Sequence, residues 1–311
     1  VLRFFQAIGG CVGMVASRAM VRDLFPVEES AKVFSMLMLV IGVSPLIAPT
    51  LGGYITASLD WHYIFITLTI MAAAILARVH FRLPESRKAD PTFSLRPNII
   101  VGNFIQISKN PQFYTYSFTG SVASAGLYAY ISGSPLVFME IFHVTEQQYG
   151  WIFAGIAAGL ILSSQMNSLV LRRYSSQQII IVALAFQATV GLMLVLGTYI
   201  GYLGVYGTIA LIFLFLCCQG FTFPNASALA LAPFSKQAGS ASALTGAIQM
   251  GLGALASALV SIFNNHSALP MTAVMAGCSL TGFIILLVGN RNIRYKASRD
   301  EVEEHTTDLI L

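Results

Sequence analysis

Few residues in this 311-residue sequence could do chemistry inside apolar surroundings, and Arg3 is the first of them. An arginine within a membrane-spanning segment costs about 3 kcal/mol or more unless it faces protein or water. Gln6 follows one helical turn later, which places an R-x-x-Q pair on one helix face. We expect Arg3 either to face a cavity, where it can couple to a proton carrier or an anionic group, or to reach the outer membrane surface with its long side chain.

Prolines and glycines gather in the segment Gly42–Gly53. Pro45 and Pro49 lie one turn apart, and Gly52 and Gly53 follow. Prolines bend a helix, and glycines let a second helix approach its backbone closely. This density exceeds what ordinary packing requires, so we expect a functional bend here.

Uncharged polar side chains are the remaining candidates within apolar runs. Amides and hydroxyls in such runs either line a cavity or join helices by hydrogen bonds. The candidates for a cavity wall are Tyr130, Ser134, Gln219, Asn225 and Gln249.

Acidic residues and metal-ligand spacings are missing from the apolar runs. All 13 acidic residues map to loops, span ends or the C-terminal tail. The five histidines and four cysteines lack metal-ligand spacing, and no H-E-x-x-H, G-x-S-x-G or P-loop motif occurs. We therefore expect no enzymatic activity, no cofactor and no nucleic-acid partner.

The composition identifies the elements that must position these residues. Hydrophobic residues make up 56% of the chain and charged residues 10%, against about 25% charged in soluble domains. The long uncharged runs, such as Tyr174–Ser235, do not alternate as strands of a membrane barrel would. We expect an all-α polytopic membrane protein, because a helix satisfies its own backbone in lipid. The nine expected spans are Val1–Met20, Val33–Leu59, Trp61–Phe81, Phe113–Met139, Tyr149–Leu169, Ile179–Tyr199, Leu203–Leu231, Ala238–Phe263 and Leu269–Val288.

The distribution of Lys and Arg predicts the orientation. Of the 17 basic residues, 16 lie at or near one membrane face, and the exception is Arg3. The positive-inside rule puts that face, with the loop Leu83–Gln112 and the C-terminal tail, in the cytoplasm. Apolar residues after Pro97 suggest a short amphipathic helix on the membrane surface, although a solvated linker fits the pattern as well.

Motif strings in this sequence resemble a known transporter family. The run Arg3–Gly10 resembles the fourth-helix motif R-x-x-Q-G-x-G of major facilitator drug:proton antiporters, with Ala7 in place of a glycine. The run Ser44–Gly53 resembles their fifth-helix motif G-x-x-x-G-P-x-x-G-G, with Ser44 and Ala48 in place of glycines. Longer strings, among them residues 17–23, 83–86, 130–135 and 238–243, resemble the Bcr/CflA branch of bacterial drug exporters.

The resemblance implies a major facilitator fold in which nine transmembrane helices correspond to helices 4–12 of twelve. Residues 1–83 would belong to the N-terminal half and 84–112 to a cytoplasmic central loop. Residues 113–290 would form the C-terminal six-helix half, and 291–311 a cytoplasmic tail. On this layout three N-terminal spans are missing, so we expect a truncated form.

The resemblance also implies a function and roles for residues. It implies proton-coupled export of small amphipathic drugs across the bacterial inner membrane by a monomer that needs only the proton gradient. By position, Arg3 and Gln6 would take the coupling role, and Pro45, Pro49, Gly52 and Gly53 would bend the antiporter-motif helix. A degenerate cytoplasmic gate would include Asn167, Arg172 and Arg173. Two alternatives remain: a major facilitator exporter or importer of a metabolite such as an amino acid, and an inactive truncated remnant.

Overall fold

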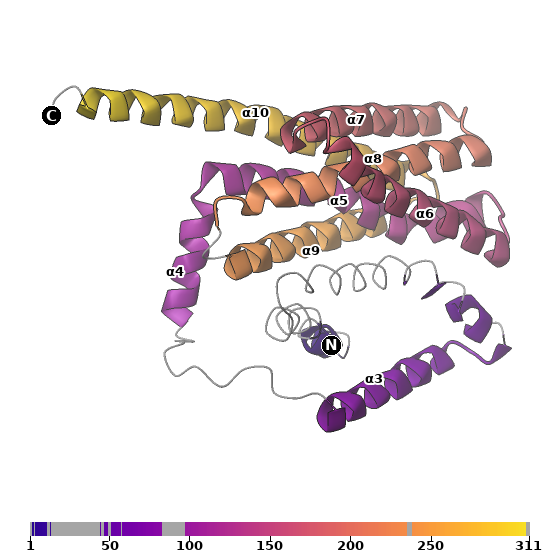
Figure 1. Cartoon of the computed structure of the whole chain (residues 1–311). Helices are drawn as coiled ribbons and strands as arrows, with labels where there is room; N and C mark the ends of the chain where they lie inside the picture. The colour runs from indigo at the N-terminus through magenta and orange to yellow at the C-terminus, as the bar shows by residue number, and fades with distance from the viewer. Residues whose placement is uncertain are drawn as a thin grey trace. The chain divides into compact units, whose positions relative to one another are not determined.

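The computed structural model of the chain describes residues 2, 4–10, 13, 44, 47–48, 51–56, 58–82, 97–234 and 238–308 (Figure 1). The chain divides into two compact units, Val1–Ser94 and Leu95–Leu311. The boundary lies within the predicted central loop. The assignment of the two units to halves of a twelve-helix protein stays a prediction.

In the first unit, the long described helix is α3 (His62–Arg82). Its length and apolar composition suffice to cross a membrane, and none of its residues is buried. Residues 4–10 and 51–56 are also helical. Most of the first two predicted spans lies outside the described residues.

The start of α3 is held by Asp60. The carboxylate accepts a hydrogen bond from the Trp61 N–H at 2.6 Å and lies 2.7 Å from the His62 ring Nδ1. These two bonds, the one from His62 first, hold the pKa of the Asp60 carboxyl below its usual value. Asp60 also has a positive φ of 135°, so the chain turns sharply into the helix here.

In the described residues of the second unit, the regular elements are all helices joined by short links (Figure 1). Its elements are α4 (Pro97–Ser108), α5 (Pro111–Pro135), the π-helical η1 (Leu136–Ile141), α6 (Glu146–Val170), α7 (Ser176–Ile200), α8 (Val205–Leu231), α9 (Ala238–Ile262) and α10 (Leu269–Asp308). With α3, seven segments in the described part of the chain are long and apolar enough to span a membrane. These seven match the last seven predicted spans, with most ends shifted by no more than three residues.

Local sequence signals explain where these helices begin. Asn110 accepts bonds from the N–H groups of Gln112 and Phe113, which caps α5. Thr145 with Gln148, and Ser175 with Gln178, form capping boxes at the starts of α6 and α7. Each cap satisfies backbone N–H groups that a helix leaves without partners.

Two features of these helices differ from the prediction. The fourth span continues past Pro135 as η1, because proline lacks the N–H that would bond to the Ile131 carbonyl and the next turn widens. The last span runs without a break into the tail, so α10 extends to Asp308 and projects beyond its neighbours (Figure 1). The stretch after Pro97 is the helix α4, which settles the choice between a helix and an irregular linker.

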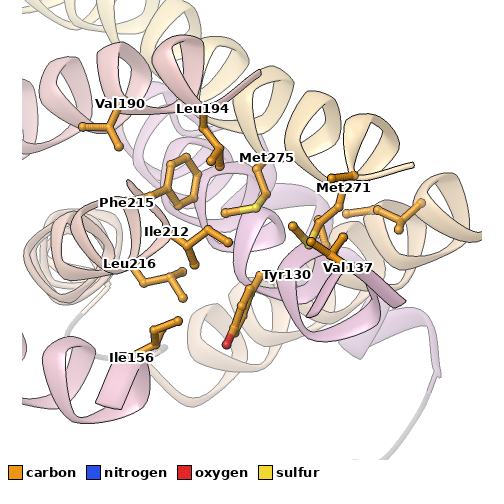
Figure 2. Close-up of a cluster of buried hydrophobic side chains, with 14 of the residues drawn as sticks. Tyr130, Val137, Ile156, Val190, Leu194, Ile212, Phe215, Leu216, Met271 and Met275 are labelled. Atoms are coloured by element: carbon orange, nitrogen blue, oxygen red, sulfur yellow. The ribbon is translucent and has the colours of Figure 1, made fainter. Parts of the chain in front are cut away.

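The centre of the second unit is α5, which packs against α8, α9 and α10. Close approach depends on small residues: a Cβ added at Gly120 would lie 2.7 Å from the Ala226 side chain on α8. Apolar side chains from α5, α6, α7, α8 and α10 fill a buried cluster around Phe215, Leu216 and Met275 (Figure 2). Ile107 of α4 is fully buried in a second cluster, so α4 packs against one end of the unit.

Charge separates along the helices of this unit. Lys109 precedes α5, Arg172 and Arg173 follow α6, and Arg291 lies near the end of the membrane-spanning part of α10, all toward the end that carries α4 (Figure 1). The opposite end carries no Lys or Arg in the links 142–145, 201–204 and 263–268. This is the asymmetry on which the predicted orientation depends.

Candidate functional site

The structure describes only some of the motif residues of the first unit. Arg3, Pro45 and Pro49 lie outside the described residues. Gln6 is exposed in the helical segment 4–10. At Gly52 and Gly53 an added Cβ would meet no described atom within 4 Å.

A chain of three polar side chains crosses the second unit through Gln219. The Gln187 amide of α7 donates to the Gln219 oxygen of α8 at 3.3 Å, and the Gln219 amide in turn donates to the Ser124 hydroxyl of α5. Gln187 and Gln219 are 0% and 3% exposed, respectively. Gln219 therefore joins three helices, which is the second of the two roles that the sequence left open for it.

A second polar pair joins α6 to α8 near the α4 end. The Asn225 amide donates to the Asn167 side-chain oxygen at 2.7 Å and to the Phe221 carbonyl at 2.8 Å. Both asparagines are at least 95% buried. Asn167 was singled out as a gate residue, and the structure ties it to a residue expected in the cavity wall.

The other two gate candidates lie apart from this pair. Arg172 and Arg173 are exposed in the turn after α6. They share the basic end of the unit with Lys109. Their charges are thus available to solvent, lipid headgroups or another part of the protein.

Near the opposite end, Tyr130 and Ser134 lie in the seam between α5 and α6. The Ser134 hydroxyl is 2.8 Å from the Tyr149 hydroxyl of α6. The Tyr130 ring stacks on Phe153 with 5.9 Å between centroids and lies at the edge of the buried cluster (Figure 2). Two hydroxyls and two rings thus join the C-terminal end of α5 to the N-terminal end of α6.

The helix α6 is therefore held at both ends by polar contacts. Between them it packs closely on α8, where Gly159 receives the Phe213 ring and Gly220 lies against Ser163 and Leu160. The sequence singled out Asn167 and Ser134 separately. It singled out Asn225 as well but gave no signal that Asn225 bonds to Asn167 or that Tyr149 bonds to Ser134, because hydrogen bonds between distant segments leave no local pattern.

Gln249 differs from the other four cavity candidates because it is only half-buried. It lies on α9, one turn before Gly253, and next to the 57%-exposed Met250. Tyr128 of α5 donates a hydrogen bond from its hydroxyl to the Met250 sulfur at 3.5 Å. An exposed face of α5 and α9 thus carries polar and sulfur-containing side chains at mid-span.

The exposed faces of α7 and α10 are mainly apolar. The most exposed residues in the middle of α7 are apolar, and Thr189 there bonds its hydroxyl to the Ala185 carbonyl. The exposed large residues near the middle of α10 are also apolar, among them Ile284 and Leu287. Lipid accepts such faces without cost, whereas polar groups need protein or water.

Comparison with known proteins agrees with these features. Residues 1–258 match the model of the Major Facilitator Superfamily. The chain is 32% identical to the bicyclomycin resistance protein homolog of Haemophilus influenzae, over 89% of this chain and 69% of that protein. It is 26% identical to the multidrug resistance protein MdtL of Escherichia coli O81, over 97% of this chain and 75% of that protein.

A solved structure supports the fold. The chain superposes on a bacterial homolog of the human lysosomal transporter Spinster, in an inward-facing and unoccupied conformation, with a TM-score of 0.56. The superposition covers 88% of this chain and 72% of that one at 11% sequence identity. The chain belongs to the Major Facilitator Superfamily of membrane transporters and, within it, resembles the Bcr/CflA-type drug-resistance branch.

Proposed function

We propose that this transporter exports small amphipathic drugs across the bacterial inner membrane in exchange for protons. The observation that carries the proposal is the similarity, over nearly the whole chain, to proteins named for bicyclomycin and multidrug resistance. The R-x-x-Q run at Arg3 and the proline–glycine run before Gly53 support it as antiporter motifs.

The character of the second unit supports an amphipathic cargo. The spans from α5 to α10 hold no Asp, Glu, Lys or Arg away from their ends. A zwitterionic amino acid presents two full charges, and burying them without charged partners is costly. An uncharged drug, or one whose single charge is spread over an aromatic ring system, needs only apolar surface and a few hydrogen bonds, which amides and tyrosines supply.

The orientation is part of the proposal. We place the α4 end of the second unit and the tail after Val288 in the cytoplasm, because the basic residues gather there. Cysteine labelling tests this placement: Gly201 and His266, changed singly to cysteine, should react with an impermeant maleimide from outside. A cysteine at Arg173 should react only in broken cells, and labelling of Arg173 from outside would invert the topology.

Drug resistance tests the export. The native gene product, including any residues encoded before Val1, should raise the bicyclomycin resistance of a sensitive host. A protonophore should remove drug efflux within minutes, because the proton gradient drives it. Efflux that survives the protonophore would refute proton coupling. Unchanged resistance in cells that hold the protein in their membrane would refute drug export, and radiolabelled amino-acid transport in the same cells then tests the metabolite alternative.

Variants of the motif residues separate coupling from binding. Arg3→Ala should abolish protonophore-sensitive efflux while leaving drug binding to the purified protein in place, because arginine stays charged and is expected to act on the coupling step. Gly52→Leu should abolish export by filling the face that another helix needs. Normal resistance in either variant, at normal abundance, would remove that residue from the mechanism.

A further inference from the structure

Tyr128 is held against α9 by three contacts. Its ring covers Gly253 so closely that an added Cβ there would lie 2.6 Å from the ring. Its hydroxyl donates to the Met250 sulfur at 3.5 Å, and its backbone carbonyl accepts a bond from the Ser257 hydroxyl at 3.2 Å. The glycine thus makes the recess, and the ring lies in a defined position rather than moving freely.

The same site leaves polar groups open. Tyr128 and Gln249 are partly exposed, and Met250 is 57% exposed. Within the described residues the Gln249 amide makes no hydrogen bond, and the Tyr128 hydroxyl has only a thioether, which is a weak acceptor. We refer to Tyr128, Gln249 and Met250 as the Tyr128 patch.

The register of α5 and α9 places a further polar group at this level. Ser117 bonds to Thr245 below the patch, and Tyr128 bonds to Ser257 above it, so Ser121 lies level with Gln249. The Ser121 hydroxyl is buried and has no hydrogen-bond partner among the residues that the structure describes. An amide and a hydroxyl with free hydrogen-bonding capacity therefore lie at one depth, near the middle of both spans.

Lipid is an unsuitable neighbour for the Tyr128 patch. In the hydrocarbon core, an unpaired amide or hydroxyl costs several kcal/mol because nothing there can hydrogen-bond to it. The mid-span faces of α7 and α10 show what this protein presents to lipid, namely apolar side chains. The Tyr128 patch therefore faces protein or a water-filled space, and in a transporter such a space at mid-span is the substrate path.

We propose that the Tyr128 patch contacts the transported molecule and favours planar aromatic compounds that carry a hydrogen-bonding group. This inference rests on the proposed function and adds a substrate class to it. The tyrosine face offers offset stacking worth about 1 kcal/mol, and the flexible thioether adapts to rings of different shape. The Gln249 amide supplies a donor and an acceptor, and Gly253 is the positioning residue that sets the ring in its place.

The test compares two cargoes in the native gene product. Ethidium is planar and aromatic, whereas bicyclomycin has no aromatic ring. Tyr128→Leu should raise the KM for ethidium efflux about fivefold, as the loss of one stacking contact predicts, and should raise the KM for bicyclomycin by less, because a cargo without an aromatic ring cannot stack. Tyr128→Phe keeps the ring and should change the KM by less than about twofold. Tyr199→Leu, on the exposed face of α7, is the matched control and should change neither cargo.

Gly253→Ala provides a second variant that retains the tyrosine. The added methyl would displace the Tyr128 ring, so the KM for ethidium should rise with little change in kcat. Equal losses for ethidium and bicyclomycin, or none for either in Tyr128→Leu, would refute the inference and leave drug export standing. Bicyclomycin export by the wild-type protein without ethidium binding or efflux would refute it as well. If the wild-type protein exports neither compound, the proposed function itself fails.

Discussion

The helices α5 and α7 are both 25 residues long and lie in the same unit, yet they occupy opposite environments. The sequence of α5 is rich in serine, threonine, glycine and tyrosine, and most of the helix is buried. The sequence of α7 is a run of aliphatic residues with few polar interruptions, and it exposes large side chains such as Phe186 and Leu196. In water the more apolar helix would be expected at the centre.

The reversal follows from the solvent. Lipid tails are as apolar as leucine, so burying α7 would bring no hydrophobic gain, while its outer face costs nothing in the bilayer. The hydroxyls and glycines of α5 gain most from protein neighbours: Tyr116 bonds to Asn290 at 2.9 Å, Ser117 to Thr245 at 3.4 Å, and Gly120 admits Ala226. Polar pairing and close packing therefore determine that α5 lies at the centre of the unit.

The largest effect should come from a charge on the outer face of α7. Phe186 is 52% exposed at mid-span, so Phe186→Lys should cost about 3 kcal/mol and reduce the protein in the membrane severely. Gln249→Lys on α9 should be tolerated better, because that face meets protein or water. The two variants are compared by the amount of full-length protein in washed membranes. Equal losses would mean that the two faces meet the same surroundings.

Close packing of α5 gives the next prediction. Gly120→Leu should destabilise the unit by about 2–3 kcal/mol, because the side chain would enter the space of Ala226. Gly277→Leu on α10 is the control, because nothing lies within 4 Å of an added Cβ there. Thermal unfolding of the detergent-purified protein measures both. If Gly120→Leu unfolds at the wild-type temperature, α5 is less tightly packed than described.

The buried asparagine pair should have a smaller effect. Asn225→Leu leaves the Asn167 amide buried without its donor and should cost about 1–2 kcal/mol. The double variant Asn225→Leu with Asn167→Leu should cost less than the sum of the two single variants, because no orphan remains. A double-mutant cycle on unfolding temperatures gives the coupling. Strict additivity would show that the two side chains act independently.

The smallest effect is expected where α5 meets α6. Tyr149→Phe removes the hydroxyl that lies 2.8 Å from Ser134 but keeps the ring packed on Phe138 and Phe153. Stability should fall by about 0.6 kcal/mol, the average found for hydrogen bonds between membrane helices. Faster cysteine labelling at Gly150, with unchanged labelling at Arg173, would locate the loosening at the N-terminal end of α6. Identical labelling at both sites would assign Tyr149 to packing alone.

Much of the architecture was accessible from the sequence because bilayer thickness demands long apolar runs and charged residues mark their ends. The predicted span ends Leu231, Ala238 and Leu269 coincide with helix ends in the structure. The continuation of α10 through the charged tail was not foreseen, because residues after Val288 look like a solvated tail by composition. The π-helix after Pro135 was also unseen, since sequence shows where a helix is disturbed and not how it recovers.

The candidate site divides in the same way. The sequence by itself determined which residues are polar in apolar surroundings, among them Gln219, Asn225 and Gln249, because residue type alone shows that cost. Only the tertiary structure decided that the amides of Gln219 and Asn225 hydrogen-bond to neighbouring helices. It also decided that the Gln249 side chain lies partly exposed beside Tyr128. The reason is physical: a hydrogen bond across a seam depends on the register of two helices far apart in the chain, and that register is set by many small packing contacts at once.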